Sequence, residues 1–310
     1  MTLNHTPTFD PPQNTRRPID SPHTRLGTSA GLRAMTGLPT MTALALAALF
    51  WNPVAQGQTV TTAADTTTEA VTTEAVTAEA PAAPTMTDAE QREAGKRLLA
   101  EVIAAHGGDA FVSQRSQVSK GEGMLRPLGQ AQAGNVPSIT VTKVFPERHH
   151  VAMDLGSGSL VQRFDGSQGS VESTNASGET TVGDLTEFFQ KRQFFGFDIL
   201  RRTDLEWVAR KLENEEADGV SWERLEIELD SGQTTRFYFE PGKRLVSIVI
   251  YVLDGETVTE KYSRYSAVEG VQVPHRIELF QRKAKVLDFE VNSVEVNTEV
   301  ASELFGRPAS

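Results

Sequence analysis

The chain has 310 residues, of which 38% are hydrophobic and 23% charged, and its formal net charge is −11. Because it contains no cysteine, disulfides, cysteine-ligated zinc, iron–sulfur clusters, thiol catalysis and cysteine-linked lipid are all excluded. Nucleic-acid phosphates and anionic membrane surfaces attract basic proteins, so the acidic balance argues against both as partners.

The first 57 residues have the pattern of a signal-peptide region. The apolar run from Met41 to Trp51 is too short to span a bilayer but has the length of a signal-peptide core. Arg25 and Arg33 precede it without an intervening acid, and Ala55-Gln-Gly57 follows as a small-residue cleavage site. We therefore predict an exported chain with no transmembrane segment after cleavage; the alternative is a short buried helix. The region before the apolar run is longer than is usual for a signal peptide, so the sequence does not fix the position of the start codon.

Residues 58–87 form a second region of distinct composition. They are almost entirely Thr, Ala, Glu, Val and Pro, and the sequence Thr-Glu-Ala-Val-Thr at 68–72 returns at 73–77. Such a stretch has no aromatic anchor and buries too little surface to offset the entropy of ordering it. We predict a disordered linker here, followed by one folded domain at 88–310.

The folded domain is expected to open with a helix. Thr87 and Glu90 have the spacing of a capping box, in which each side chain accepts a hydrogen bond from the other residue's backbone. Gly107-Gly108 predicts the end of the helix, and His106 in its last turn is interpreted as a cap that suits the helix dipole. Four apolar residues at helical spacing predict its buried face: Leu98, Leu99, Val102 and Ile103.

After the helix the hydrophobic period changes to two, which predicts β-strands. Residues 138–145 and 223–230 alternate between apolar and polar positions, and Phe237 and Phe239 share one face of a later strand. Glycine-containing turn pairs separate these runs at intervals typical of hairpins. The positions expected to face inward are Ile139, Val141, Phe145, Leu225, Ile227, Leu229, Val273, Ile277 and Leu279. With no alternation of strand and helix, an antiparallel sheet is favoured over a parallel one.

Strand 244–253 departs from this pattern because it is apolar on both faces. By strict alternation, one face carries Val246, Ile248 and Ile250, and the opposite face carries Leu245, Val249 and Tyr251. In an antiparallel sheet with one face exposed to solvent, a strand is expected to be apolar on one face only. The strand is therefore either covered on both sides, or one face contributes to an apolar cavity or contact surface.

A second helix is predicted at about 184–195. The sequence from Asp184 to Glu187 resembles another capping box, and the apolar residues that follow have helical spacing. The segment is rich in phenylalanine, at Phe188, Phe189, Phe194, Phe195 and Phe197. The rings either pack against the sheet as core or form a lid that faces a hydrophobic ligand.

The motifs of common enzymes are missing from the sequence. It contains no zinc-hydrolase histidine pattern, no Gly-x-Ser-x-Gly elbow and no phosphate-binding glycine loop. His149 and His150 are adjacent in a predicted strand, so their rings point to opposite faces and cannot hold one ion. We predict a protein that is not an enzyme and has neither a cofactor nor a metal site.

Several motifs in order resemble the outer-membrane lipoprotein carrier superfamily, the LolA/LolB-like proteins. The likeness covers roughly residues 88–306. It rests on Ala105-His-Gly-Gly-Asp-Ala110, Thr140-Val-Thr-Lys-Val-Phe-Pro146, Val161-Gln-Arg-Phe-Asp-Gly166, Tyr265-Ser-Ala-Val-Glu-Gly-Val-Gln-Val-Pro-His-Arg276, Val294-Glu-Val-Asn297 and Leu304-Phe305. The resemblance implies a mainly β (α+β) fold: a curved antiparallel sheet or incomplete β-barrel, with an N-terminal helix and an internal aromatic helix packed in the concave face.

The resemblance also implies a function and a set of site residues. Proteins of this superfamily shield acyl chains in the periplasm, which predicts a periplasmic carrier or binding protein for lipid or acylated lipoprotein. The implied cavity or lid residues are Phe188, Phe189, Phe194, Phe195, Val246, Ile248 and Ile250. The alternative is a cell-envelope interaction or sensor module that uses the same apolar sheet face to bind a protein. One departure is clear: carriers of this type usually have an arginine before the strand-ending proline, where this chain has Phe145.

Overall fold

The computed structural model describes residues 86–128 and 132–306. The predicted signal-peptide region and most of the predicted linker lie outside the described residues. The helical segments are α2 (Asp88–His106), α3 (Asp109–Val112), α4 (Thr186–Arg192) and the 3₁₀ turns η1 (Phe197–Arg201) and η2 (Ser302–Phe305). The strands are β1 (Ser116–Leu125), β2 (Gly134–Val144), β3 (Arg148–Asp154), β4 (Ser159–Phe164), β5 (Gly169–Thr174), β6 (Thr180–Asp184), β7 (Trp207–Ala217), β8 (Val220–Leu229), β9 (Thr234–Phe239), β10 (Val246–Leu253), β11 (Glu256–Val268), β12 (Val271–Gln281) and β13 (Ala284–Val296).

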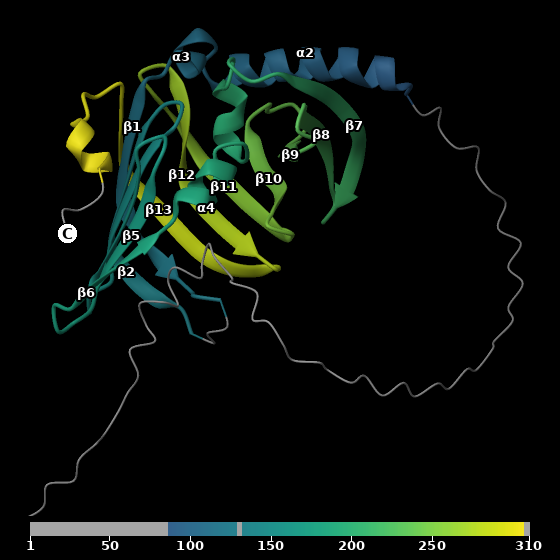
Figure 1. Ribbon diagram of the computed structural model, residues 1–310. Helices are drawn as coiled ribbons and strands as arrows, with labels where there is room; N and C mark the ends of the chain where they lie inside the picture. The colour runs from purple at the N-terminus through teal and green to yellow at the C-terminus, as the bar shows by residue number, and fades with distance from the viewer. Residues whose placement is uncertain (1–85, 129–131, 307–310) are drawn as a thin grey trace, which may run out of the picture. The chain divides into compact units, whose positions relative to one another are not determined.

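The strands form one antiparallel sheet of thirteen in the order β6-β5-β4-β3-β2-β1-β13-β12-β11-β10-β9-β8-β7. Consecutive strands pair within β1–β6 and within β7–β13, and the last strand returns to pair with the first. β6 and β7 are the two edges, so the sheet is not closed into a barrel. Its strands curve around α4, while α2 lies across β7 and β8 (Figure 1). The predicted fold class is confirmed.

Three hairpins of the second half are set by two-residue turns. Asp218-Gly219, Asp254-Gly255 and Glu269-Gly270 each have positive φ at both positions, from 48° to 83°. This is the pattern of the type I′ turn, whose twist matches that of paired strands, and it favours glycine at the second position. These pairs connect β7 to β8, β10 to β11 and β11 to β12, and the turns that the sequence predicted at the three positions are confirmed.

Helix α2 begins and ends where the sequence indicates. The Thr87 backbone N–H donates to the Glu90 carboxylate, and the Glu90 N–H donates to the Thr87 hydroxyl, which confirms the capping box. Gly107 follows at the C-terminus with φ 123°. The buried face carries Leu98, Leu99 and Val102, which pack in the same cluster as β7 and β8 residues. Burial of these side chains supplies most of the stability of a helix of this kind.

His106 differs from its predicted role as a charged cap. Its side chain is fully buried, with ring centroids 5.3 Å from Phe111 and 5.1 Å from Phe197. Burial, together with the nearby charge of Arg201, lowers the pKa of His106 to about 4. The ring is therefore neutral near pH 7, where its Nε2 atom accepts a hydrogen bond from the Val246 N–H at 3.2 Å. His106 ties α2 to β10 and does not offset the helix dipole.

The buried apolar side chains form two clusters. The first cluster joins α2, α3, η1 and β7–β13, and the second joins β1–β5, β13 and the start of α4. The phenylalanine-rich segment contributes to both: Phe188 and Phe189 belong to the second cluster, whereas Phe195 and Phe197 belong to the first. The segment therefore lies where the two clusters meet.

Candidate functional site: a cavity beside helix α4

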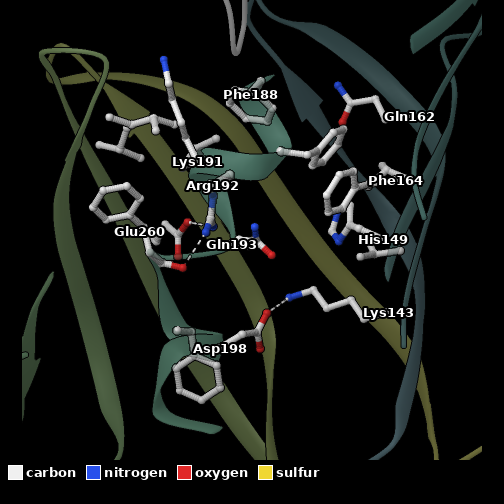
Figure 2. Close-up of a pocket in the computed structure, with 18 of the residues that line it drawn as sticks. Lys143, His149, Gln162, Phe164, Phe188, Lys191, Arg192, Gln193, Asp198 and Glu260 are labelled. Atoms are coloured by element: carbon white, nitrogen blue, oxygen red, sulfur yellow. Dashed lines mark hydrogen bonds and ion pairs between the residues drawn. The ribbon is translucent and has the colours of Figure 1, made fainter. Parts of the chain in front are cut away.

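A cavity of about 910 Å³ lies where the two clusters meet. Its lining comes from β2–β4, from α4 and η1, and from β10–β13 (Figure 2). Ligand sites commonly have volumes of about 300–1,000 Å³ and bury most of a small ligand. The size is therefore that of a ligand site, and the lining decides which chemistry it accepts.

The wall made by β2, β3 and β4 changes from polar to apolar along the strands. Lys143 pairs with His149, and His149 pairs with Phe164, so these three form one transverse row. Two residues further along β2, Val141 pairs with Val151, which in turn pairs with Gln162. The next row pairs Ile139 with Met153. All eight of these side chains line the cavity, which is therefore polar at one end of this wall and apolar at the other.

Helix α4 is attached to β5 at close range. The Thr186 hydroxyl accepts from the Gly169 N–H at 2.9 Å, and the Leu185 N–H donates to the Gly169 carbonyl at 3.1 Å. A Cβ at position 169 would lie 2.8 Å from Leu185 backbone atoms and from the Phe189 ring. Only glycine therefore lets the helix approach β5 closely enough for the Phe189 ring to stack on Phe164, with centroids 5.2 Å apart.

The helix itself is shorter than predicted. It runs from Thr186 to Arg192 with Leu185 as N-cap, whose side chain makes no capping hydrogen bond. Asp184 instead accepts from the Thr186 N–H at 2.7 Å, a local turn in place of the capping box expected with Glu187. The predicted end at residue 195 is wrong because the chain turns before Gly196, whose φ is 82°.

Arg192, the last residue of α4, joins the helix to the opposite half of the sheet. Its Nη2 donates to Glu260 on β11 at 2.5 Å, and its Nη1 donates to the Phe195 carbonyl at 2.7 Å. Glu260 also accepts from the Tyr251 hydroxyl at 2.8 Å and from the Tyr262 hydroxyl. Burial, with the charge of Glu260, raises the pKa of both tyrosines, so they stay protonated donors. All four groups are thus mutually satisfied.

A second ion pair crosses the polar end of the cavity. The Lys143 Nζ atom lies 2.5 Å from Asp198 of η1 (Figure 2). Burial opposes ionisation of Asp198, but the charge of Lys143 still holds the pKa of that carboxyl below its usual value. Arg201 lies 3.7 Å from the same carboxylate, and its guanidinium is 3.7 Å from the Phe111 ring centroid. The arginine also lies 4.7 Å from the ring centroid of Phe145, which gives that residue a packing role.

Among the described residues, two polar side chains of the wall made by β2, β3 and β4 lack a hydrogen-bond partner for a side-chain nitrogen. The Gln162 side-chain nitrogen is buried without a hydrogen bond, and the residue is only 2% exposed. His149 makes a ring contact with Phe189 but no hydrogen bond among the described residues. Burial, and then the charges of Lys143 and Arg192, lower its pKa to about 3, so the ring is neutral near pH 7. Both side chains can therefore bind a ligand without breaking an existing bond.

The predicted phenylalanines divide between cavity and core. Phe188, Phe189 and Phe195 line the cavity, whereas Phe194 packs against the first cluster and is not among the lining residues. The Phe195 ring stacks on Tyr251, with centroids 5.2 Å apart. Side chains of this segment thus both pack as core and face the cavity, so the two interpretations left open by the sequence overlap.

The prediction that Val246, Ile248 and Ile250 share one face of β10 is wrong. None of the three is among the cavity-lining residues. The register with β9 shifts between Val246 and Ile248, and this bulge places Val246 on the buried face with Val249. Ile248 and Ile250 lie half-buried on the other face. Tyr251 is the buried β10 residue whose side chain lines the cavity.

The polar half of the site was missed at the level of sequence. Lys143 continues the inward series of Ile139 and Val141, and Glu260 falls between Val258 and Tyr262 at the same period. Alternation alone therefore carried the signal for both inward charges. Asp198 lies in a 3₁₀ turn, and no periodic pattern pointed to it.

The described residues contain neither a cluster of metal-ligating side chains nor a helix suited to spanning a membrane. Within residues 86–128 and 132–306, no group of three or more His, Cys, Asp or Glu side chains is arranged to hold a metal ion. None of the helices in the same ranges combines the length and apolar character needed to cross a membrane.

No family model matches the chain, and no curated protein matches it. Among solved structures, a domain described as an outer membrane lipoprotein-sorting protein from Vibrio parahaemolyticus is 11% identical, with a TM-score of 0.45 over 69% of this chain and 97% of that chain. A DUF1329 family protein from Desulfovibrio piger is 10% identical, with a TM-score of 0.46 over 70% and 97%. A LolA superfamily protein from Nitrosomonas europaea is 14% identical, with a TM-score of 0.43 over 67% and 96%.

The likeness to these solved structures concerns the fold alone. At these identities and TM-scores the likeness says nothing about ligand or function. The cavity is therefore the feature of this protein that bears on its function.

Proposed function

We propose that this protein binds or carries lipid or lipoprotein acyl chains in the periplasm and is not an enzyme. The observation that carries the proposal is the cavity of about 910 Å³ beside α4, with Phe164, Phe188 and Phe189 at one side. Burying hydrocarbon yields roughly 0.8 kcal/mol per CH₂ group, so a chain of about ten such groups gains several kcal/mol without any catalytic group.

The two carboxylates inside the cavity are both held in ion pairs, which supports a binding role over a catalytic one. Glu260 accepts from Arg192 and two tyrosines, and Asp198 is paired with Lys143. A general acid or base must be free to exchange its proton with a substrate. Neither carboxylate meets that condition while its ion pair is intact.

Titration with a fluorescent fatty acid tests the proposal. Purified protein is expected to give a saturable signal, because the dye leaves water for an apolar site. Val141→Trp adds a large ring within the cavity and is expected to weaken binding at least tenfold with retained circular dichroism. Val252→Trp, at a residue 54% exposed and absent from the lining, is the matched control and keeps full affinity. The absence of saturable binding by the wild type contradicts the proposal, as does equal affinity of both variants.

Export to the periplasm is the second part of the proposal. It rests on the apolar run from Met41 to Trp51 and the cleavage pattern at Ala55-Gln-Gly57. Expression in a Gram-negative host followed by cell fractionation and N-terminal sequencing tests it. A processed chain starting near Gln58 in the periplasmic fraction supports export, whereas a full-length chain in the cytoplasm contradicts it.

A protein-interaction or sensor role is the second candidate, and one observation favours it. Ile248, Ile250 and Val252 follow one another at alternating positions on the face of β10 away from the cavity, and Val252 is 54% exposed. A protein that co-purifies with the wild type and is lost on Ile248→Asp would support this role. Lipid-loaded protein without such a partner would contradict it.

A further inference from the structure

The polar end of the cavity indicates which head group a bound chain carries. The relevant side chains are Lys143, His149 and Gln162 on one wall and Arg192 on α4, with Asp198 and Glu260 as the paired carboxylates (Figure 2). All face the same space as the phenylalanines of α4. A ligand with only hydrocarbon would leave the side-chain nitrogens of His149 and Gln162 unpaired among the described residues.

The unused hydrogen-bonding capacity of this end consists mainly of donors. Lys143 carries three N–H donors, of which Asp198 takes one. The Gln162 side-chain nitrogen has no acceptor, and neutral His149 has one N–H to donate. The Gln193 side-chain oxygen and the second ring nitrogen of neutral His149 are acceptors without a partner among the described residues. Because buried donors favour pairing, the missing partner is a group rich in acceptor oxygens.

The charge balance of the interior points the same way. Three cations, Lys143, Arg192 and Arg201, face two carboxylates, those of Asp198 and Glu260, so this group has a net charge of plus one. The remaining charged residues of the lining are more exposed. Lys191 pairs with Glu187 and Asp254, and Arg282 pairs with Glu256. The lining also includes Glu147, Arg148 and Asp184, which together add one negative charge at the rim. Solvent screens charges at the rim more than charges inside. One negative charge inside the cavity would therefore balance the group.

We propose that the cavity binds a single-chain amphiphile with an anionic, oxygen-rich head group, a carboxylate or a phosphate monoester. The head group lies at the row of Lys143 and His149, and the chain extends along β2 and β3 toward Ile139 and Met153. This inference rests on the proposed function and adds the ligand class. The two head groups share the same chemistry at this site, a negative charge on oxygens that accept hydrogen bonds.

Displacement of an uncharged dye tests the head group directly. N-phenyl-1-naphthylamine is bound first and then displaced at pH 8 by decanoate, decyl phosphate, decanol or decylamine, which share one chain length. An anionic head that gains a charge-assisted hydrogen bond worth about 1.5–3 kcal/mol competes about tenfold or more better than the alcohol. Comparison of decanoate with decyl phosphate shows whether the site prefers a carboxylate or a phosphate monoester. Decylamine is expected to be the weakest competitor.

Two variants locate the head group, and a third serves as control. Lys143→Met and His149→Leu are each expected to bring decanoate close to decanol while the potency of decanol stays within about twofold. His149→Leu removes no hydrogen bond to any described residue, so this variant still tests the position of the head group if loss of the Lys143 ion pair prevents folding. Lys120 is the control, because its side chain is 54% exposed and does not line the cavity. Lys120→Met is expected to keep the wild-type preference for decanoate over decanol.

The outcomes separate this inference from the proposed function. Equal displacement by decanoate and decanol, or a stronger effect of decylamine, overturns the anionic head group and leaves acyl-chain binding standing. An unchanged preference in His149→Leu overturns the assigned position of the head. Failure of the dye and of every competitor to bind overturns the proposed function itself.

Discussion

Removal of the Arg192 guanidinium is the sharpest test of how α4 is held. In Arg192→Met the Glu260 carboxylate, 4% exposed in the native protein, keeps its tyrosine donors but loses its counter-charge. Breaking one side of a buried ion pair costs about 3–5 kcal/mol. Because the Arg192 side chain is 30% exposed toward the cavity, we expect the lower end, about 3 kcal/mol.

Urea unfolding followed by tryptophan fluorescence measures this loss of unfolding free energy. A double-mutant cycle then assigns the loss to the pair of Arg192 and Glu260. Glu260→Gln keeps an acceptor for the tyrosines while removing the charge, so the double variant is expected to be more stable than the sum of the single changes by at least about 1 kcal/mol. Arg282→Met is the matched control, because the Arg282 pair with Glu256 lies at the surface and its loss should leave the midpoint nearly unchanged. A loss below about 0.5 kcal/mol in Arg192→Met, typical of a surface change, would refute the reasoning.

Three further predictions concern stability. His149 has a pKa of about 3 when folded and about 6.5 when unfolded, so its contribution is present above pH 6.5 and falls by about 2 kcal/mol between pH 7 and pH 5; an identical urea pH profile in His149→Gln would contradict this. Gly169→Ala is expected to cost about 1–3 kcal/mol through its collision with Leu185 and Phe189, and a wild-type melting temperature would contradict it. Val249→Ala should cost more than Ile250→Val in urea unfolding, because Val249 is fully buried and Ile250 is half-buried; the reverse order would contradict the face assignment.

Most of the sheet could be predicted from local sequence because its signals are local. Alternation of apolar and polar residues marks the inward faces of β8 and β9, and the pair Asp218-Gly219 encodes a turn that requires positive φ. The capping box of α2 lies within four residues. In each case the physical cause and the sequence pattern fall in the same short window.

The errors arose where distant contacts decide the local structure. The bulge of β10 depends on pairing with β9, and it moves Val246 to the face opposite Ile248. The length of α4 is set by its attachment to Gly169 and by the turn at Gly196. His106 is neutral because rings from separate segments bury it.

The candidate site was half predicted for the same reason. The phenylalanines of α4 stand out by composition, so an apolar cavity was expected. The charged side chains at Lys143 and Glu260 occupy inward strand positions, but the ion pairs that stabilise them there come from η1 and α4. A strand pattern contains no information about such partners.

The central claim is that a hydrocarbon chain occupies the space between the two clusters, and anomalous scattering tests it most directly. Crystals grown with 12-bromododecanoic acid place a heavy atom at the end of the chain. We expect one bromine peak inside the cavity near Ile139 and Met153, with density for the carboxylate at Lys143. A bromine peak on the outer face of β10 instead, or a cavity filled by side chains with no peak at saturating ligand, would contradict the claim.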